Sequence, residues 1–238
     1  GPLGSRFELA GSGAAAFHLS WPAGRLVVEP QRASIQANGV VNAASYRPAL
    51  APGGLMAIFG SGLARAGAPT EVEMSGIAAR VVAATPFQLN VEVPLGLTPG
   101  LHALRVRSPF GTVEQQVTVQ AVAPAIFSLP TGGAAIVNQD GTINGPSNPV
   151  RRGQAVVIYC TGLGEVTQAG PPHWAKEPVR VMVDGRELAP LFAGRTPNFS
   201  GLYQVNVLIP SSLPPSLDAS LVLRQGTVTS NAVPLAIE

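Results

Sequence analysis

The residues Gly60-Ser61-Gly62-Leu63 directly follow the apolar run Leu55–Phe59. One hundred residues later, Cys160-Thr161-Gly162-Leu163 directly follow the apolar run Val156–Tyr159. Internal repetition at a fixed spacing indicates that one structural unit occurs more than once in a chain. We therefore expect two similar modules in tandem, each with a buried strand that leads into a glycine-containing turn.

A second pair of matching stretches, Phe87–Pro94 and Tyr203–Pro210, carries the sequence Gln-x-Asn in both copies. The offset between the copies is 100 residues at the first pair and 116 residues at this one, so the second copy contains additional residues. We place them in two loop insertions, 164–178 and 194–201, because both segments are rich in glycine and proline.

Short strands are the predicted elements of both copies. Apolar and polar side chains alternate from Phe87 to Val93, which is the period of a half-buried strand, and Phe87 is expected on the buried face with Leu89. Asp184-Gly185, directly after Val181–Val183, predicts a tight hairpin turn. No segment has a sustained helical period, and 27 glycines and 23 prolines separate the apolar runs. The predicted fold class is all-β, with two tandem immunoglobulin-like antiparallel β-sandwiches.

These patterns divide the chain into four parts. Residues 1–13 begin with Gly-Pro-Leu-Gly-Ser and are interpreted as an expression-tag remnant and linker. Residues 14–37 are an N-terminal extension, either an extra strand on the first sandwich or the end of a preceding domain. The first β-sandwich repeat is expected over 38–123 and the second over 124–238.

Composition argues against several classes of partner. Hydrophobic residues make up 46% of the chain and charged residues 12%, so a buried core is well supplied. The net charge is only +2, with no sustained basic stripe, which argues against a nucleic-acid partner. No apolar stretch reaches the roughly 18 residues that a membrane span requires. We expect neither a nucleic-acid partner nor a membrane span.

Catalytic chemistry lacks a recognisable constellation in the sequence. The three histidines, His18, His102 and His173, are far apart and have no metal-ligand spacing. Cys160 is the only cysteine, which excludes an internal disulfide and a cysteine-based zinc site. Gly60-Ser61-Gly62 is not a nucleophile elbow, because the glycines that this motif requires are missing on both sides. We therefore predict that the chain is not an enzyme and uses no cofactor.

The two insertions hold the candidate ligand-binding residues. Loops on a rigid scaffold frequently carry binding sites, and these loops contain His173, Trp174, Asn198 and Phe199. Aromatic faces can stack on sugar rings while amide groups fix the orientation of the ligand. The alternative is that Trp174 and Phe199 fold back and cover the rim of their own domain.

A weak candidate for a calcium site lies near the start of the second copy. Asn138, Asp140 and Asn144 supply side-chain oxygens at close spacing, but they include a single carboxylate, whereas calcium loops normally contain several. The alternative is an Asp-Gly turn with alternating apolar flanks. Because the segment has a single carboxylate, we predict a turn and no metal site.

The order of several short motifs resembles a known family. The motifs are Val40-Val41-Asn42-Ala43-Ala44-Ser45-Tyr46, Ile58-Phe59-Gly60, Pro124-Ala125-Ile126-Phe127, Asn138-Gln139-Asp140-Gly141-Thr142-Ile143-Asn144, Tyr159-Cys160-Thr161-Gly162-Leu163-Gly164 and Gly201-Leu202-Tyr203-Gln204-Val205-Asn206-Val207. From about residue 40 to the C-terminus the chain resembles the Solibacter-type C-terminal domain, an uncharacterised module of exported acidobacterial proteins. Each half is also similar to the IPT/TIG class of immunoglobulin-like domains. The resemblance implies an exported context and a non-catalytic role.

Three functional hypotheses follow. The first is a non-catalytic extracellular or cell-surface accessory module, a spacer or interaction domain at the C-terminus of a larger exported protein. The second is a carbohydrate-binding module that uses the aromatic side chains of the insertions in the second repeat. The third is an enzyme with an unrecognised, scattered site. The partners that these hypotheses predict are a polysaccharide or another cell-surface protein.

Overall fold

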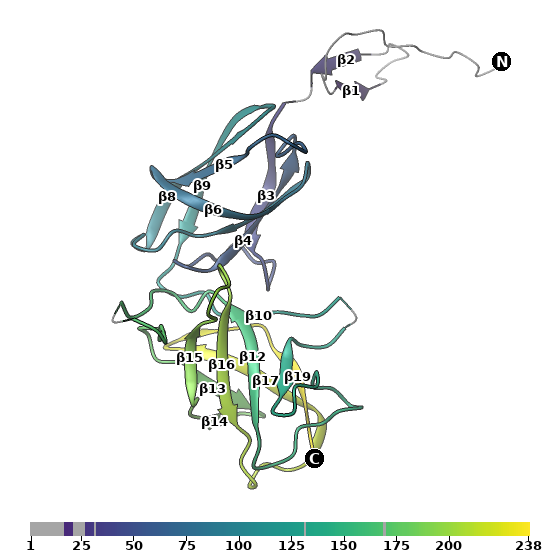
Figure 1. The fold of residues 1–238 in the computed structure, drawn as a ribbon, viewed down its shortest axis with the longest axis vertical. Coiled ribbons are helices and arrows are strands. Elements are labelled where there is room, and N and C mark those ends of the chain that lie inside the picture. Colours follow the sequence, from purple (N-terminus) through teal and green to yellow (C-terminus); the bar gives the residue numbers. More distant parts are fainter. Residues whose placement is uncertain (1–16, 21–26, 31, 131, 169) are drawn as a thin grey trace, which may run out of the picture. The chain divides into compact units, whose positions relative to one another are not determined.

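The computed structural model describes residues 17–20, 27–30, 32–130, 132–168 and 170–238. These residues form strands and loops, and no helix occurs among them. A helix that could span a membrane is accordingly not found in the described part of the chain. Every pair of strands is antiparallel, which confirms the predicted all-β class (Figure 1).

The chain divides into two compact units, residues 1–32 and residues 33–238. In the first unit, strands β1 (Phe17–Ser20) and β2 (Val27–Pro30) pair with each other. The next strand, β3, begins at Ser34 in the second unit, four residues before the expected domain boundary at residue 38. The prediction for residues 1–13 lies outside the described residues.

The first half of the second unit, here called module 1, consists of seven strands. These are β3 (Ser34–Asn42), β4 (Leu55–Ser61), β5 (Glu71–Met74), β6 (Ile77–Ala84), β7 (Gln88–Glu92), β8 (Gly100–Ser108) and β9 (Gly111–Val119). The strand order is β3-β4-β7-β6-β5-β8-β9. Strand β6 pairs with β5 through its first residues and with β7 through its later ones, so it connects the two halves of the sheet.

The two halves of this sheet bury a common apolar core. The fully buried side chains of this core include Met56, Ile58, Met74, Leu89, Val91, Leu104 and Val106. They come from β4 and β7 in one half and from β5 and β8 in the other. Burying each such side chain contributes about 1.5–3 kcal/mol. The core therefore combines side chains from both halves of the sheet.

Module 2 contains the remaining ten strands. These are β10 (Ala125–Ile126), β11 (Ile136–Asn138), β12 (Ala155–Thr161), β13 (Arg180–Val183), β14 (Arg186–Leu188), β15 (Phe192–Arg195), β16 (Tyr203–Leu208), β17 (Ser216–Gln225), β18 (Val228–Thr229) and β19 (Val233–Ile237). One sheet has the order β10-β12-β16-β15 with β11 beside β12, and the other has the order β14-β13-β17-β18 with β19 beside β17. The buried side chains of both sheets form a second core.

Two local predictions have different outcomes. The hairpin at Asp184-Gly185 is confirmed, because both residues have positive φ angles, 46° and 76°, and connect β13 to β14. The placement of Phe87 is wrong, since its side chain is 66% exposed. The hydroxyl of Thr85 accepts a hydrogen bond from the Gln88 amide at 2.9 Å, so Phe87 lies in a turn before the strand begins.

Buried hydrogen bonds join the two modules. The hydroxyl of Thr161 accepts a bond from the Leu55 amide and donates one to the Gly201 carbonyl, both at 2.7 Å. The side-chain amide of Asn42 donates to the Ala123 carbonyl at 3.0 Å. Buried polar groups that pair in this way stabilise the junction, because leaving them unpaired would cost about 1–3 kcal/mol each.

Tyr203 adds a second contact at the junction. Its hydroxyl donates to the Gly164 carbonyl at 2.7 Å and lies 3.3 Å from the Pro52 carbonyl in module 1. Burial raises the pKa of this hydroxyl above its ordinary value, so it remains a protonated donor. A side chain at Gly53 would clash with it, since a Cβ atom there would lie 2.3 Å from the Tyr203 oxygen.

The repeated glycine turn has a structural reason in the second copy. Gly162 has a φ of 76°, and a Cβ atom at this position would lie 2.1 Å from the Ala123 carbonyl oxygen. The Ala123 amide also donates to the Gly162 carbonyl at 2.8 Å. Gly62 has a similar φ of 60°, so both copies leave strand β4 or β12 through the same backbone conformation.

Candidate functional site

The first insertion, 164–178, is a loop with a paired stem. The Thr167 amide donates to the Trp174 carbonyl at 2.8 Å, and the Arg195 amide donates to the His173 carbonyl at 3.0 Å. The returning stem therefore runs beside β15. Gly194 permits this approach, because a Cβ atom there would lie 2.1 Å from the His173 carbonyl oxygen.

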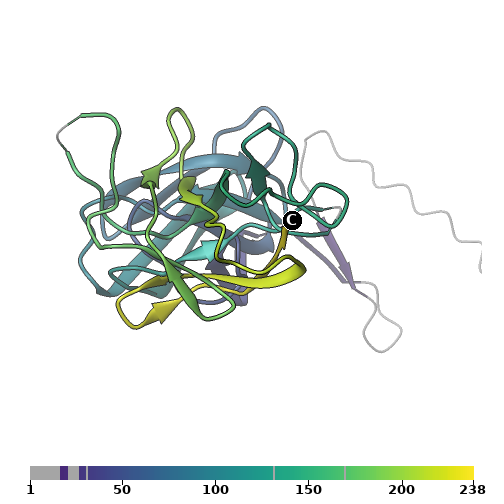
Figure 2. The same cartoon turned by 90° about the horizontal axis from the view of Figure 1, so that it is seen from below.

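The loop of the second insertion lies within the segment 194–201. Gly194 and Arg195 belong to β15, so the loop starts at Thr196, whose amide donates to the Leu202 carbonyl at 3.0 Å. Asn198 has a φ of 66°, a left-handed conformation that asparagine tolerates better than most residues. In Figure 2 this loop and the first insertion, drawn in two shades of green, project on the same side of the molecule.

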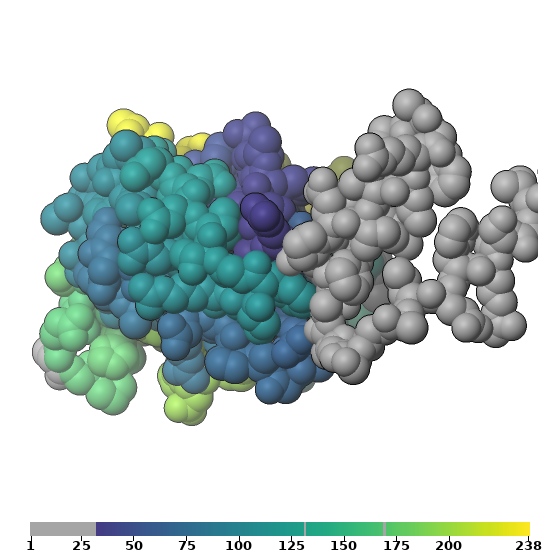
Figure 3. All heavy atoms as spheres, turned by 90° about the horizontal axis from the view of Figure 1, so that it is seen from above, coloured from purple at the N-terminus to yellow at the C-terminus, as the bar shows by residue number. Residues whose placement is uncertain are grey.

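The two insertions and module 1 enclose an open cavity of about 760 Å³, here called the junction cavity. Its lining residues are Arg80, Leu95, Val166, Gln168, Pro171, Pro172, His173, Arg195, Thr196, Pro197, Asn198, Phe199 and Ser200. Seen from above, the green atoms of both insertions emerge beside module 1 (Figure 3). Three of the four predicted ligand-binding residues, His173, Asn198 and Phe199, therefore lie in one cavity, whose size is typical of small-ligand sites.

The fourth predicted residue, Trp174, does not line this cavity. Its ring packs edge-on against the ring of Phe192, with a distance of 4.8 Å between the ring centroids. The Trp174 side chain is nevertheless 43% exposed and that of Phe199 is 60% exposed. The alternative interpretation expected both side chains to fold back and be buried at the rim of module 2, and neither is buried there.

Two arginines line the junction cavity, Arg195 from module 2 and Arg80 from module 1. A guanidinium nitrogen of Arg195 donates to a carboxylate oxygen of Glu92, in β7, at 2.6 Å. Both side chains are largely buried, with 22% of Arg195 and 12% of Glu92 exposed. Arg80, in β6, is the second arginine of the lining. Sequence reasoning missed Arg80, because no local pattern brings a residue of β6 to a loop of the other copy; Arg195 lies in the predicted second insertion but was not singled out there.

Thr196 is a further residue of the lining that the sequence did not indicate. Its hydroxyl is buried and has no hydrogen-bond partner among the described residues. An unpaired buried hydroxyl costs about 1–3 kcal/mol unless another group satisfies it. Thr196 lies between Arg195 and Asn198 in the lining, and its hydroxyl is covered by the surrounding wall.

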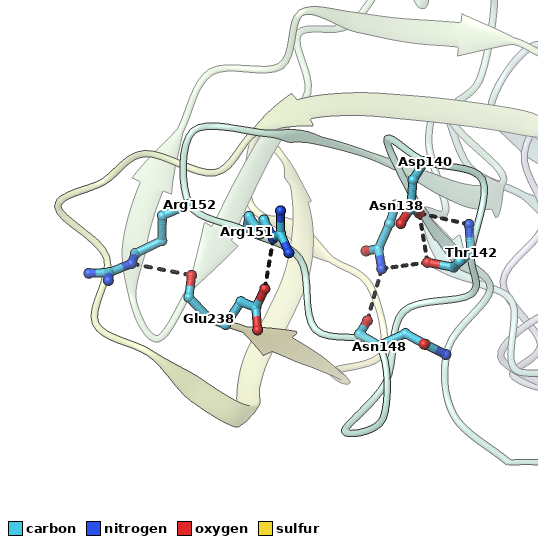
Figure 4. Close-up of polar contacts among 7 residues, drawn as sticks. All are labelled: Asn138, Asp140, Thr142, Asn148, Arg151, Arg152 and Glu238. Atoms are coloured by element: carbon cyan, nitrogen blue, oxygen red, sulfur yellow. Dashed lines mark hydrogen bonds and ion pairs between the residues drawn. The ribbon is translucent and has the colours of Figure 1, made fainter.

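The weak calcium candidate is a hydrogen-bonded turn (Figure 4). The Asn138 side-chain amide donates to the Thr142 hydroxyl at 3.1 Å and to the Asn148 carbonyl at 2.8 Å. A carboxylate oxygen of Asp140 accepts bonds from the amide and the hydroxyl of Thr142, at 2.9 and 2.7 Å. These bonds lower the pKa of Asp140, so the stability they add is present above its ordinary pKa and is lost as the pH falls through the lowered value.

Asn144, the third residue of this candidate, is buried and hydrogen-bonded within the protein. Its side-chain amide donates to the Asn138 side-chain oxygen at 3.0 Å and to the Ala236 carbonyl at 2.9 Å. Its own oxygen accepts a bond from the Ala236 amide at 2.9 Å. The side-chain oxygens of both asparagines are therefore occupied by hydrogen bonds within the protein.

The other residues considered for chemistry, Cys160 and His102, do not line the junction cavity. Cys160 is fully buried, and burial raises the pKa of its thiol. His102 forms hydrogen bonds with the Ser75 hydroxyl at 3.0 Å and the Thr98 carbonyl at 2.8 Å. Within the described ranges, no three His, Cys, Asp or Glu side chains gather in a cluster that could hold a metal.

Comparison with known proteins gives distant structural likenesses only. No protein-family profile and no curated protein matches the chain. Among solved structures, a surface glycan-binding protein of Bacteroides ovatus with a mixed-linkage heptasaccharide has 14% identity and a TM-score of 0.29, over 94% of this chain and 48% of that one. A surface glycan-binding protein of Prevotella bryantii has 14% identity and a TM-score of 0.30, over 93% of this chain and 42% of that one.

A tandem of immunoglobulin domains from titin has 12% identity and a TM-score of 0.26, over 80% of this chain and 91% of that one. The chain spans less than half the length of the first four solved structures that it matches. At these TM-scores the likenesses carry no argument about function, which has to come from the junction cavity.

Proposed function

We propose that this chain is a non-catalytic carbohydrate-binding module of an exported protein, with its ligand in the junction cavity. The observation that carries the proposal is the composition of the cavity wall. The exposed ring of Phe199 offers an apolar face, and the side chains of Asn198, Gln168 and Ser200 offer neutral hydrogen-bonding groups beside it. A sugar presents this combination of an apolar ring face and peripheral hydroxyl groups.

The polar groups of the wall are suited to binding rather than to proton transfer. Amides, hydroxyls and arginines keep one protonation state near neutral pH. His173 lies with Nδ1 3.1 Å from the Thr167 carbonyl, which orients its ring within the loop. We therefore assign the wall a recognition role and place the chain at the cell surface or outside the cell.

The finer architecture is part of the same proposal. We propose that each module is an immunoglobulin-like sandwich of the IPT/TIG class and that the chain is a Solibacter-type C-terminal domain. Two separate apolar cores and the glycine turn that recurs at Gly62 and Gly162 support this assignment. The resemblance in sequence supplies the exported context.

The test is binding of the purified chain to a panel of soluble and insoluble polysaccharides, with Phe199→Ala as the variant. Loss of the ring is expected to weaken binding about tenfold, which corresponds to about 1.4 kcal/mol. Trp174→Ala is the matched control, because Trp174 is also an exposed aromatic residue of the insertions but lies outside the cavity. Its affinity is expected to equal that of the parent.

Two results would contradict the proposal. Equal affinities of the parent and Phe199→Ala would move the ligand away from the junction cavity. No binding to any polysaccharide would favour the second candidate, a structural spacer. The hydrogen bonds of Thr161 with Leu55 and of Tyr203 with Pro52 are the observation that supports a spacer, because they join the two modules.

A further inference from the structure

The wall of the junction cavity has an unbalanced charge. Arg80 and Glu92 lie directly opposite each other on the paired strands β6 and β7, and Glu92 binds Arg195 of module 2 at 2.6 Å. Arg80 is exposed and forms no ion pair with any residue that the structure describes. One carboxylate therefore stands among two guanidinium groups, and a net positive charge remains at the wall.

The remaining lining residues do not neutralise this charge. None of the described residues that line the junction cavity is Asp or Glu. A second cavity, of about 460 Å³ in module 1, provides a contrast within the same molecule. It also contains two arginines, Arg105 and Arg107, but the carboxylates that pair with them, Glu73 and Glu71, line the same cavity.

We propose that the junction cavity binds an acidic sugar, one that carries a carboxylate group, with Arg80 as the partner of that carboxylate. This inference rests on the proposed carbohydrate-binding function and names the substrate class. The guanidinium group is a planar fork that matches the two oxygens of a carboxylate and remains charged at all relevant pH values. Arg195 is held in place by Glu92, whose carboxylate balances its charge, so the net positive charge of the wall is that of Arg80.

The buried hydroxyl of Thr196 supports the proposal independently of charge. It lines the cavity and lacks a partner among the described residues, whereas most buried hydroxyls in proteins are paired. Binding of the sugar would have to expose this covered hydroxyl, and a hydroxyl or ring oxygen of the sugar would then supply the missing partner. The site thus combines the guanidinium group of Arg80, the aromatic ring of Phe199 and the hydroxyl of Thr196, which lacks a hydrogen-bond partner.

The experiment compares three uronate polymers, polygalacturonate, alginate and hyaluronan, with their methyl-esterified forms, which retain the sugars but lack the negative charge. Affinity for these polymers and for dextran sulfate is measured by isothermal titration for the parent, Arg80→Gln, Arg107→Gln and Phe199→Ala. The parent is expected to bind at least one acid about tenfold more tightly than its ester, and to lose this preference in Arg80→Gln. The control Arg107→Gln removes an arginine of the second cavity and is expected to retain the preference. Added salt should weaken binding of the acid more than binding of the ester.

The outcomes separate the inference from the proposed function. Equal affinity for an acid and its ester, with both lost in Phe199→Ala, would overturn the acidic sugar and leave carbohydrate binding intact. No binding to any polysaccharide, acidic or neutral, would overturn both. Binding of dextran sulfate as tight as binding of the uronate, and unchanged in Arg80→Gln, would indicate adsorption of polyanions and would also overturn the inference.

Discussion

The unpaired hydroxyl of Thr196 is expected to lower the stability of the protein and to contribute to the proposed binding. Its buried hydroxyl has no partner among the described residues, so the folded protein carries the cost of desolvating it. Thr196→Val keeps the shape of the side chain and removes the unpaired group. We expect the free energy of unfolding to stay equal or to rise by about 1 kcal/mol. Affinity for the carbohydrate should fall in the same variant.

Urea unfolding and binding measured on the same preparation test this expectation. Thr142→Val is the matched control, because the Thr142 hydroxyl donates to Asp140 and accepts from Asn138. The control should lose about 1 kcal/mol of stability or more. A comparable loss in Thr196→Val would mean that its hydroxyl has a partner in the folded protein.

Among the elements, the segment between β11 and β12 depends on one buried asparagine. Asn144 forms three hydrogen bonds, two of them to the backbone of Ala236 in β19. Asn144→Ala would leave both Ala236 groups without these partners, and we expect it to lower the free energy of unfolding by about 2–4 kcal/mol. Chemical denaturation followed by fluorescence measures this change.

Asn148→Ala is the control for this prediction. Asn148 contributes its backbone carbonyl to Asn138, while its side chain is exposed, so the substitution should change stability by less than about 0.5 kcal/mol. Similar losses in both variants would show that the Asn144 bonds add little. Adding calcium to the parent should leave Tm unchanged, and a clear rise in Tm would restore the calcium interpretation.

Strands were predictable from the sequence where local rules decide them. The alternation around Leu89 and the Asp184-Gly185 turn require only neighbours in sequence, and both were predicted. Phe87 was misplaced because the hydroxyl of Thr85 forms a turn with the Gln88 amide. Phe87 lies in this turn, and strand β7 begins only after it. In module 1 a single strand, β6, pairs with both β5 and β7. In module 2 two separate strands take these places, since β14 pairs with β13 and β15 pairs with β16. Alternation of apolar and polar residues does not identify pairing partners, so this difference could not be predicted.

At the scale of the whole molecule, the site belongs to both modules. His173, Asn198 and Phe199 could be nominated from the sequence, because the offset between the repeats reveals the insertions that contain them. Arg80 could not, because it reaches the cavity only through the packing of module 1 against those insertions. The charge that selects the proposed ligand is thus a property of the junction, which neither copy possesses alone.

The junction should also determine how the molecule unfolds. Thr161 has a fully buried hydroxyl that links the Leu55 amide of module 1 to the Gly201 carbonyl of module 2. Thr161→Val keeps the shape and removes both bonds, so we expect a loss of about 2–4 kcal/mol. The parent should unfold in a single calorimetric transition, and the variant in two, because the modules then unfold separately.

Thr118→Val, on the exposed face of β9, is the control and should unfold in the same single transition as the parent. A single, unshifted transition in Thr161→Val would mean that other contacts couple the modules.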